Sequence, residues 1–464
     1  MSAPGPSVDQ PARDDRLTRF ARLIGRFIPD ALSTSVILMV LVFLIALAMG
    51  NSLRATVDAF YRGLWLLLSF TMQMTLILVL SSALGASPFF KRIVRRLSRV
   101  PRSAGQVLGL ACMVTAALSY LYWGLGLALG PLIAIYFARE AEQRGIPIDF
   151  PFLLATTMAA TSVWQYGLSS TAPLMMNTPG HFLEQTTGLM PLSTTIFAPS
   201  SILYVVSFLI AAIALARLIQ PTRPQPLSDF PEAHRLADPI KAAEAEPIST
   251  RPAPEPATYS ERVEGSAVLT SVLCVALIVW LVYHFAVKGA SLDLNSLNTT
   301  LLLLSLLVHR NVRNFSRALQ AAVVSCWPVV VLYHLYAGVA GLIQFTPVGE
   351  RFASAIASIS NRYTFPLLTA LAATVVALFV PSSGGQWTIQ GFVTAKSALE
   401  VGVTAQRGLL ALSIGDQMGN LLSPFWAVVA SGIARVDFRR FIGYGMVFAG
   451  LWFVLGVMIF TFMP

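Results

Sequence analysis

The segment VPSSGGQWTIQG, from Val380 to Gly391, breaks an apolar stretch that runs from residue 363 to 395. That stretch is too long for one simple membrane crossing, because a bilayer core about 30 Å thick needs about 20 residues of helix. A second long stretch, from 104 to 138, is interrupted by YWGLGLALG at Tyr122 to Gly130. Each stretch is therefore predicted to form a re-entrant hairpin with a tip broken by glycines.

Apolar runs of spanning length flank both hairpins. The chain has 464 residues, of which 55% are hydrophobic and only 12% charged, and its mean hydropathy is +0.69. This is too little charge for the surface of a soluble protein of this size, and the alternating pattern of an outer-membrane barrel is absent. We therefore expect an all-α polytopic membrane protein. About nine transmembrane helices are predicted, at 31–50, 64–84, 151–176, 198–216, 266–287, 294–309, 318–342, 408–432 and 441–462.

The distribution of the 32 Lys and Arg residues supports this arrangement through the positive-inside rule. If the N-terminal tail, 1–30, is cytoplasmic and both hairpins are re-entrant, none of these residues lies inside the membrane and all but seven are cytoplasmic. The seven are Arg54, Arg62, Lys288, Arg351, Arg362, Lys396 and Arg407. Reading each hairpin as a straight span weakens the bias. The expected location is a bacterial-type inner membrane, crossed many times.

Two halves of the chain repeat the same order of predicted elements. In 31–216 and again in 294–464, two spans precede the hairpin, and a span broken by polar residues and a last span follow it. In the predicted topology the second copy starts on the opposite side, which is the inverted-repeat arrangement of many secondary transporters. Between the copies lie a cytoplasmic linker, 217–264, and a connecting helix within 265–293. The Pro, Ala, Glu and Ser bias of the linker predicts that it does not order itself.

Four polar segments lie at membrane depth: the two hairpin tips, at 122–126 and 380–387, and two broken helices, at 164–178 and 413–424. Polar groups in lipid are costly unless they serve a function. A broken helix offers N-terminal N–H groups to anions and free carbonyl groups to cations, so a carboxylate can be bound without an arginine. The candidate substrate-binding residues are Trp123, Gly124, Gly126, Gln165, Ser169, Ser170, Thr171, Ser382, Ser383, Gly384, Gly385, Gln386, Trp387, Asn420 and Ser423.

These candidates have a second interpretation. Serine and threonine hydroxyls also bond back to their own helices, and tryptophans also fill space near helix breaks. Asp416 is the only acidic residue inside a predicted span, and it shares a helix face with Asn420 and Ser423 at i, i+4 and i+7. It is a cation ligand, a proton carrier or a structural partner of nearby amides. The three cysteines have no metal-ligand spacing, so no metal site is expected.

Four segments, taken in order, resemble the AtoE-type short-chain fatty acid transporters: YWGLGLALG, STAPLMMNTPGHFLE, VPSSGGQWTIQG and GDQMGNLLSPFWA. The resemblance covers nearly the whole membrane portion, with departures at Ser383 and at Met418-Gly419. It implies uptake of short-chain fatty acids such as butyrate or acetoacetate. It also implies kinship to the ion transporter superfamily, whose members have two opposed hairpins, inverted repeats and often a dimeric scaffold with elevator-like movement.

The expected function is secondary active transport of a short-chain fatty acid, coupled to H+ or Na+ through Asp416. The expected partners are the small carboxylate, the coupling cation, membrane lipid and a second copy of the chain, with no cofactor beyond the coupling ion. No nucleic acid is expected, because the basic residues form no patch interleaved with aromatics. A carrier of another small organic anion, such as a dicarboxylate or an amino-acid derivative, is the alternative on the same fold. An enzyme is not expected, since no nucleophile with a base and no metal cluster occurs at depth.

Overall fold

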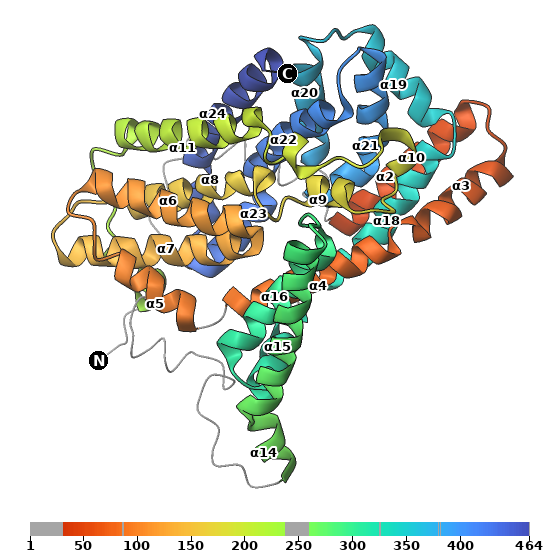
Figure 1. Ribbon diagram of the computed structural model, residues 1–464. Helices are drawn as coiled ribbons and strands as arrows, with labels where there is room; N and C mark the ends of the chain where they lie inside the picture. The colour runs from red at the N-terminus through yellow and green to blue at the C-terminus, as the bar shows by residue number, and fades with distance from the viewer. Residues whose placement is uncertain are drawn as a thin grey trace, which may run out of the picture.

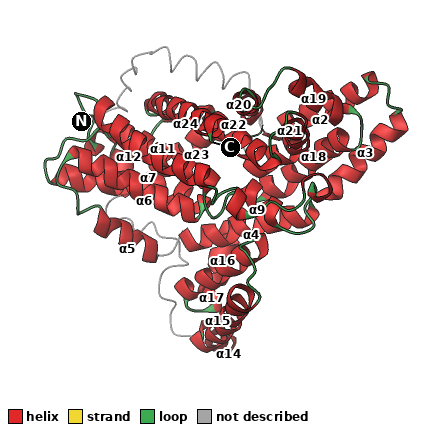
Figure 2. Ribbon diagram, turned by 45° about the horizontal axis from the view of Figure 1, so that its top comes forward, coloured by secondary structure: helices red, strands yellow, loops and turns green. Residues whose placement is uncertain are grey.

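The computed structural model describes residues 31–85, 88–236, 259–323, 326–378, 380 and 382–463. Every regular element in these ranges is a helix (Figures 1 and 2). The predicted all-α membrane fold is therefore confirmed. The predicted N-terminal tail, 1–30, and residues 237–258 of the predicted linker lie outside the described residues.

The first half of the chain contains two long helices that form the first hairpin, α6 and α7, and a helix that is broken after it. Its elements are α2 (Ala31–Ala48), α3 (Leu53–Leu66), α4 (Leu68–Gly85), α5 (Pro88–Leu97), α6 (Ala104–Leu121), α7 (Trp123–Gln143), α8 (Phe150–Ala160), η1 (Thr161–Tyr166), α9 (Thr171–Asn177), α10 (Glu184–Thr187), η2 (Leu192–Thr194) and α11 (Pro199–Ile219).

The second half begins with α16 and is preceded by a short connecting region. The connecting elements are η3 (Leu227–Asp229), α12 (Pro231–Leu236), α14 (Tyr259–Gly265), α15 (Ala267–Val282) and η5 (Tyr283–Val287). The second-half elements are α16 (Leu294–His309), α17 (Val312–Val323), α18 (Trp327–Gln344), α19 (Val348–Ser358), α20 (Phe365–Ala377), α21 (Ser383–Glu400), α22 (Ala405–Leu422), α23 (Pro424–Ala434), η6 (Phe438–Arg440) and α24 (Ile442–Phe462).

Several helices have the length and composition of membrane spans. In the described part of the chain six qualify, at 53–84, 104–121, 123–143, 199–219, 267–287 and 442–462, and a pair bent by 73°, α18 with α19, makes a seventh. Three further apolar helices are shorter, and the predicted spans at 151–176 and 408–432 are broken into pieces. Both α6 and α7 are long enough to cross, so their re-entrant course stays a prediction.

The outer surface of these helices is apolar. Only 11% of the most apolar stretch of the span 267–287, which α15 and η5 form, is buried. Val268, Val272, Val275 and Val279 lie exposed along α15. A helix that is apolar all round and exposed needs lipid as its solvent. In both views α14 to α17 form an arm that projects from the body (Figures 1 and 2).

Two predicted spans have different boundaries in the structure. The span predicted at 64–84 is extended by α3, which starts after the N-cap Ser52 and is separated from α4 by Leu67 alone. The span predicted at 318–342 is instead split, because α17 ends at Val323 and α18 begins at Trp327 with a proline in its first turn. A proline in the first turn suits a helix start, because the N–H group that it lacks would have no partner within the helix there.

The first hairpin is broken at one residue and not by its glycines, so that part of the prediction is wrong. Tyr122 has extended backbone angles, φ −156° and ψ 122°, and α7 begins at the next residue. The glycines lie inside α7 and serve close packing: a Cβ atom on Gly126 would lie 1.6 Å from the Oγ of Ser119 in α6. The Oη of Tyr122 donates a hydrogen bond of 2.9 Å to the carbonyl of Ile77, which fixes the tip against α4.

Glycines have the same role in the second half. Helix α20 ends at Ala377 and α21 begins at Ser383, so Gly384 and Gly385 lie in the first turn of α21. Gly415 lies within the unbroken helix α22, and a Cβ atom there would lie 2.0 Å from the carbonyl oxygen of Ala370 in α20. Gly415 and Gly419 therefore leave the backbone of α22 intact. The break comes at Ser423, immediately before Pro424.

Helices of each half pack on helices of the other half, in a reciprocal pattern. α2 and α3 pack on α18, whereas α16 and α17, which hold the same places in the second half, pack on α4. Likewise α9 packs on α21, and α23 packs on α7. Such an exchange is typical of two repeats related by a two-fold axis. The opposite orientation of the second copy stays a prediction.

Part of the predicted linker is ordered, which corrects the expectation drawn from its composition. Leu227 and Ala233 are buried, and the ring of Phe230 lies 5.4 Å from the ring of Phe150. The backbone N–H of Gln225 donates a hydrogen bond of 3.0 Å to Asp149, which also caps α8. A few apolar residues suffice here because the ends of α7 and α8 supply the rest of the core.

Candidate binding site at the hairpin tips

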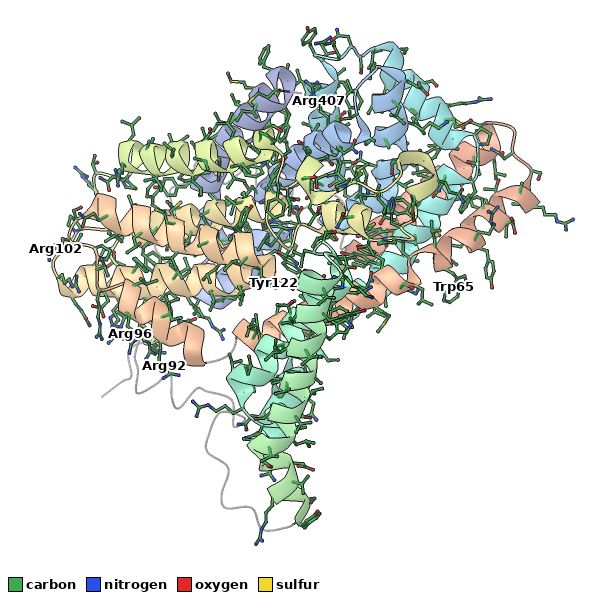
Figure 3. All side chains as sticks on the ribbon, in the orientation of Figure 1. Trp65, Arg92, Arg96, Arg102, Tyr122 and Arg407 are labelled. Carbon is green, nitrogen blue, oxygen red and sulfur yellow. The ribbon has the colours of Figure 1, made fainter. Side chains whose placement is uncertain are left out.

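A cavity of about 510 Å³ lies between the tips of the two hairpins. The first turns of α7, α9 and α21 all reach it, and a Cβ atom on Gly384 would lie 2.8 Å from the Cγ2 of Thr171. Figure 3 shows Tyr122, the residue at the break between α6 and α7, in the middle of the molecule. Seven predicted site residues line the cavity: Trp123, Gly124, Thr171, Ser382, Ser383, Gly384 and Asn420.

The walls of the cavity are mostly apolar. Met74 and Leu78 of α4, Leu332 of α18, and Val429 and Ile433 of α23 contribute to them. In the described part of the chain, no Lys, Arg, His, Asp or Glu belongs to the lining. Most of the polar groups come from the hairpin tips and the broken helices, so the cavity combines apolar walls with a limited set of hydrogen-bonding groups.

Trp123 offers the cavity a hydrogen-bond donor that has no partner in the protein's described residues. Its indole Nε1 is buried and has no hydrogen-bond partner among the described residues, although its ring belongs to the cavity lining. Its backbone N–H donates to the Oγ of Ser169 at 2.9 Å, which holds the start of α7 beside the broken helix. A buried donor without a partner costs free energy, and an anion in the cavity would remove that cost.

The start of α21 is held by hydroxyl groups. The Oγ of Ser382 caps the helix by accepting from the N–H of Gly385 at 3.4 Å, and it shares a hydrogen bond of 3.0 Å with the Oη of Tyr333. The N-cap residue of α7, Tyr122, makes no side-chain capping hydrogen bond, and Ser169 accepts only from the first N–H group of that helix. Two helix N-termini therefore meet at one cavity, and the partial positive charge of each favours an anion.

Asp416 lies behind the cavity wall and is fully buried. Its Oδ2 accepts hydrogen bonds from the Nε2 of Gln165 and, at 3.2 Å, from the Nδ2 of Asn420. Its Oδ1 has no partner among the described residues. The expected i, i+4 pairing of Asp416 with Asn420 is present, and no basic side chain in the described ranges forms an ion pair with the carboxylate.

Gln165 connects the second hairpin to this carboxylate. The Oγ of Ser383 donates to the Oε1 of Gln165 at 3.2 Å, and the Nε2 of the same amide donates to Asp416. Ser383 lines the cavity and Asp416 does not, so Gln165 lies between a group that can touch a ligand and the buried carboxylate. A chain of three polar side chains thus joins the tip of α21 to α22.

Other predicted residues lie outside the cavity lining. Ser169 accepts from the backbone N–H of Trp123, whereas Ser170 bonds locally by donating to the carbonyl of Gln165. Gln386 donates to the carbonyl of Ala373 at 2.7 Å. Trp387 is fully buried and its Nε1 has no partner in the described residues. The predicted residues that do not line the cavity are Gly126, Gln165, Ser169, Ser170, Gly385, Gln386, Trp387, Asp416 and Ser423.

The sequence did not predict the cavity residues of two spans that lack a polar break, α4 and α18. Ser82, from α4, and Tyr333 and Tyr336, from α18, line the cavity. Neither span carries a break at these positions, so the only signal was the presence of two tyrosines and a histidine in α18. Gln417 and Trp426 also line the cavity. They lie within GDQMGNLLSPFWA, the last of the four segments that carry the resemblance.

Comparison with known proteins identifies the family of this chain. The profile of the family described as short chain fatty acid transporter matches residues 15–460. An Escherichia coli (strain K12) protein provisionally named short-chain fatty acid transporter is 30% identical over 450 residues, covering 96% of this chain and 99% of the relative. A protein of the same name from Haemophilus influenzae (strain ATCC 51907 / DSM 11121 / KW20 / Rd) is 27% identical over 454 residues, covering 95% of this chain and 99% of the relative.

The fold also has a solved counterpart. The crystal structure of the Alcanivorax borkumensis YdaH transporter, described as having an unusual topology, aligns with a TM-score of 0.59 and 13% sequence identity, over 94% of this chain and 97% of that one. The membrane fold and the family match together define a multi-pass membrane transporter. The chain belongs to the short chain fatty acid transporter family.

Proposed function

We propose that this protein carries a short-chain monocarboxylate in symport with H+ or Na+, binding it in the cavity at the hairpin tips. The observation that supports this most strongly is the meeting of two helix N-termini, those of α7 and α21, in one cavity without charged lining residues. Helix N-termini attract an anion over a short range. The carboxylate group lies at the tips, near the Nε1 of Trp123, and the acyl chain lies along Met74, Leu78 and Leu332.

The absence of charge in the lining favours one carboxylate over two. Helix ends and hydroxyls offset a single negative charge, whereas a second carboxylate would lie against apolar side chains and remain unpaired, which is costly. The alternative of a dicarboxylate or amino-acid carrier would need a further charged partner in the lining. The described residues of the cavity offer none.

Asp416 is the proposed coupling group. One carboxylate oxygen is held by two amides and the other, Oδ1, is buried without a partner, which suits the binding of a proton or of Na+. Gln165 transmits occupancy of Asp416 to Ser383 at the tip of α21. Loading with the cation thereby prepares the tip for the carboxylate, and alternating access with elevator-like movement then carries both across.

Proteoliposome uptake tests this function. Labelled butyrate and acetoacetate should accumulate when an inward H+ or Na+ gradient is imposed, and Asp416→Asn should reduce gradient-driven accumulation at least about tenfold while counterflow exchange persists. Glu350→Gln is the matched control, because Glu350 is exposed, pairs with Lys396 and does not line the cavity. Absence of accumulation under either gradient contradicts the cargo assignment, and full gradient-driven uptake by Asp416→Asn contradicts the coupling role.

A further inference from the structure

A second cavity, of about 280 Å³, lies apart from the binding site, between α5 and the C-terminal end of α7. Helix α7 begins at the first cavity and ends at this one. The side chains around the second cavity are mainly basic and polar. They are Arg95, Ser98, Arg99, Tyr136, Arg139, Glu140 and Gln143.

The lining of this cavity holds three arginines and one acidic residue. Glu140 lies 3.4 Å from the Nε of Arg99 and 3.9 Å from a guanidinium nitrogen of Arg144. The guanidinium of Arg95 lies over the ring of Tyr136, 5.1 Å from its centre. One carboxylate cannot neutralise this set, so the cavity has an excess of positive charge and planar N–H donors that suit phosphate oxygens.

The surface around the cavity extends the positive charge. Figure 3 shows Arg92, Arg96 and Arg102 on the same side of the molecule, along α5 and the loop that follows it. Helix α5 is amphipathic: Val94 is buried against the core, whereas Arg92 and Arg96 are exposed. Apolar side chains are exposed among these arginines, namely Ile93 at 39% and Val100 at 61%.

The position of the cavity along the chain places it at the membrane surface. Helix α5 directly follows the apolar helix α4 and precedes the apolar helix α6, so it lies where two membrane helices end and begin. The positive-inside rule predicts that this side is cytoplasmic. Anionic phospholipids of that leaflet are attracted to basic residues at the surface, and basic pockets beside membrane helices bind their headgroups.

We propose that this pocket binds the phosphodiester headgroup of an anionic membrane phospholipid. The phosphate oxygens accept hydrogen bonds from Arg95 and Arg99, and the acyl chains run past Ile93 and Val100 toward the bilayer. A soluble phosphate would find the same donors but would gain nothing from the exposed apolar rim. The pocket is therefore a lipid site, independent of the cargo in the central cavity.

Native mass spectrometry of the full chain, titrated with phosphatidylglycerol or phosphatidylcholine, tests the site. Arg95→Gln should lower the affinity for phosphatidylglycerol about fivefold, because each arginine near a lipid surface contributes a factor of about that size. Glu140→Gln should raise the affinity by a similar factor, because a competing negative charge is lost. The matched control is Arg54→Gln, an exposed arginine of α3 outside the pocket, which should leave the affinity unchanged.

Three results would overturn the proposal. The first is equal binding of phosphatidylglycerol and phosphatidylcholine by the wild-type protein. The second is displacement of phosphatidylglycerol by an excess of inorganic phosphate, which would make a free anion the natural occupant. The third is unchanged phosphatidylglycerol affinity in Arg95→Gln or, if that variant does not fold, no gain of affinity in Glu140→Gln.

Discussion

At the scale of single residues, Trp123 can have a binding role or a packing role, and the two can be distinguished by experiment. Its ring packs against the rings of Tyr122 and Trp164, at centroid distances of 5.9 and 6.1 Å, which is what a space-filling tryptophan does. Its buried Nε1 nevertheless has no partner among the described residues. The two interpretations differ only in what that N–H group does when the cargo is present.

Trp123→Phe keeps most of the ring and removes the N–H group. A hydrogen bond to a charged group contributes about 1.5–3 kcal/mol, so we expect the KM for butyrate uptake in proteoliposomes to rise about tenfold or more, with a smaller change in kcat. Trp65→Phe is the control, since Trp65 is exposed on α3 and does not line the cavity. An unchanged KM for Trp123→Phe would leave Trp123 with packing alone.

For Gln165 the tertiary structure indicates a different role from the one that the sequence predicted. The sequence predicted it as a substrate-binding group because it lies in a polar break at membrane depth. The structure places it one layer behind the cavity, between Ser383 and Asp416. Spacing along one helix cannot reveal such a link, because the two partners of the amide come from α21 and α22.

At the scale of elements, close helix contacts position Asp416. Helix α22 packs on α20 along Gly415 and Gly419, where the backbone of one helix nearly touches the other. Adding a methyl group at Gly415 would place it 2.0 Å from the carbonyl oxygen of Ala370, which is backbone and cannot rotate away. The helices must therefore separate, and Asp416, the next residue, must move with α22.

Gly415→Ala is expected to lower the thermal unfolding temperature of the detergent-solubilised protein, because overpacking of a core costs about 1–3 kcal/mol. It should also reduce gradient-driven uptake. Gly450→Ala in α24 is the matched control, since no heavy atom lies within 4 Å of the added methyl group. Equal unfolding temperatures for the two variants would contradict the importance of this contact.

Helix breaks were the elements that the sequence predicted best. The breaks at 161–170 and at Ser423, and the two hairpins, appear where polar residues, proline and glycine interrupt apolar runs. The role of the glycines was not predictable in the same way. A glycine that unwinds a helix and a glycine that admits a neighbouring helix have the same local sequence, and only the position of Ser119 or Ala370 distinguishes them.

At the scale of the whole molecule, the helix contacts show which helices correspond in the two halves. Equivalent positions can therefore be chosen to test how the two repeats are oriented. Ser52 precedes α3 and Asn311 precedes α17, so the two residues hold corresponding positions in the two copies. In an inverted repeat these positions face opposite sides of the membrane, and in a parallel repeat they face the same side.

Ser52→Cys and Asn311→Cys, each in a background without the three native cysteines, should react with a membrane-impermeant thiol reagent from opposite sides. We expect Asn311→Cys to react from the cytoplasmic side and Ser52→Cys from the other, as the positive-inside rule predicts. The three native cysteines are free thiols, although they are buried, so removing them leaves the introduced cysteine as the only thiol that can react. Labelling of both positions from one side would exclude an inverted repeat.

Composition and the spacing of polar breaks were enough to determine the class of this protein, because lipid imposes helices of defined length and leaves polar residues only where they have a use. The same information indicated the two hairpins and Asp416. Only the tertiary structure decided which side chains share the cavity. Tyr333 enters it from α18 and Ser82 from α4, while Gln165 is withdrawn behind it. Such neighbours are set by the packing of helices far apart in the sequence, and no local pattern encodes that packing.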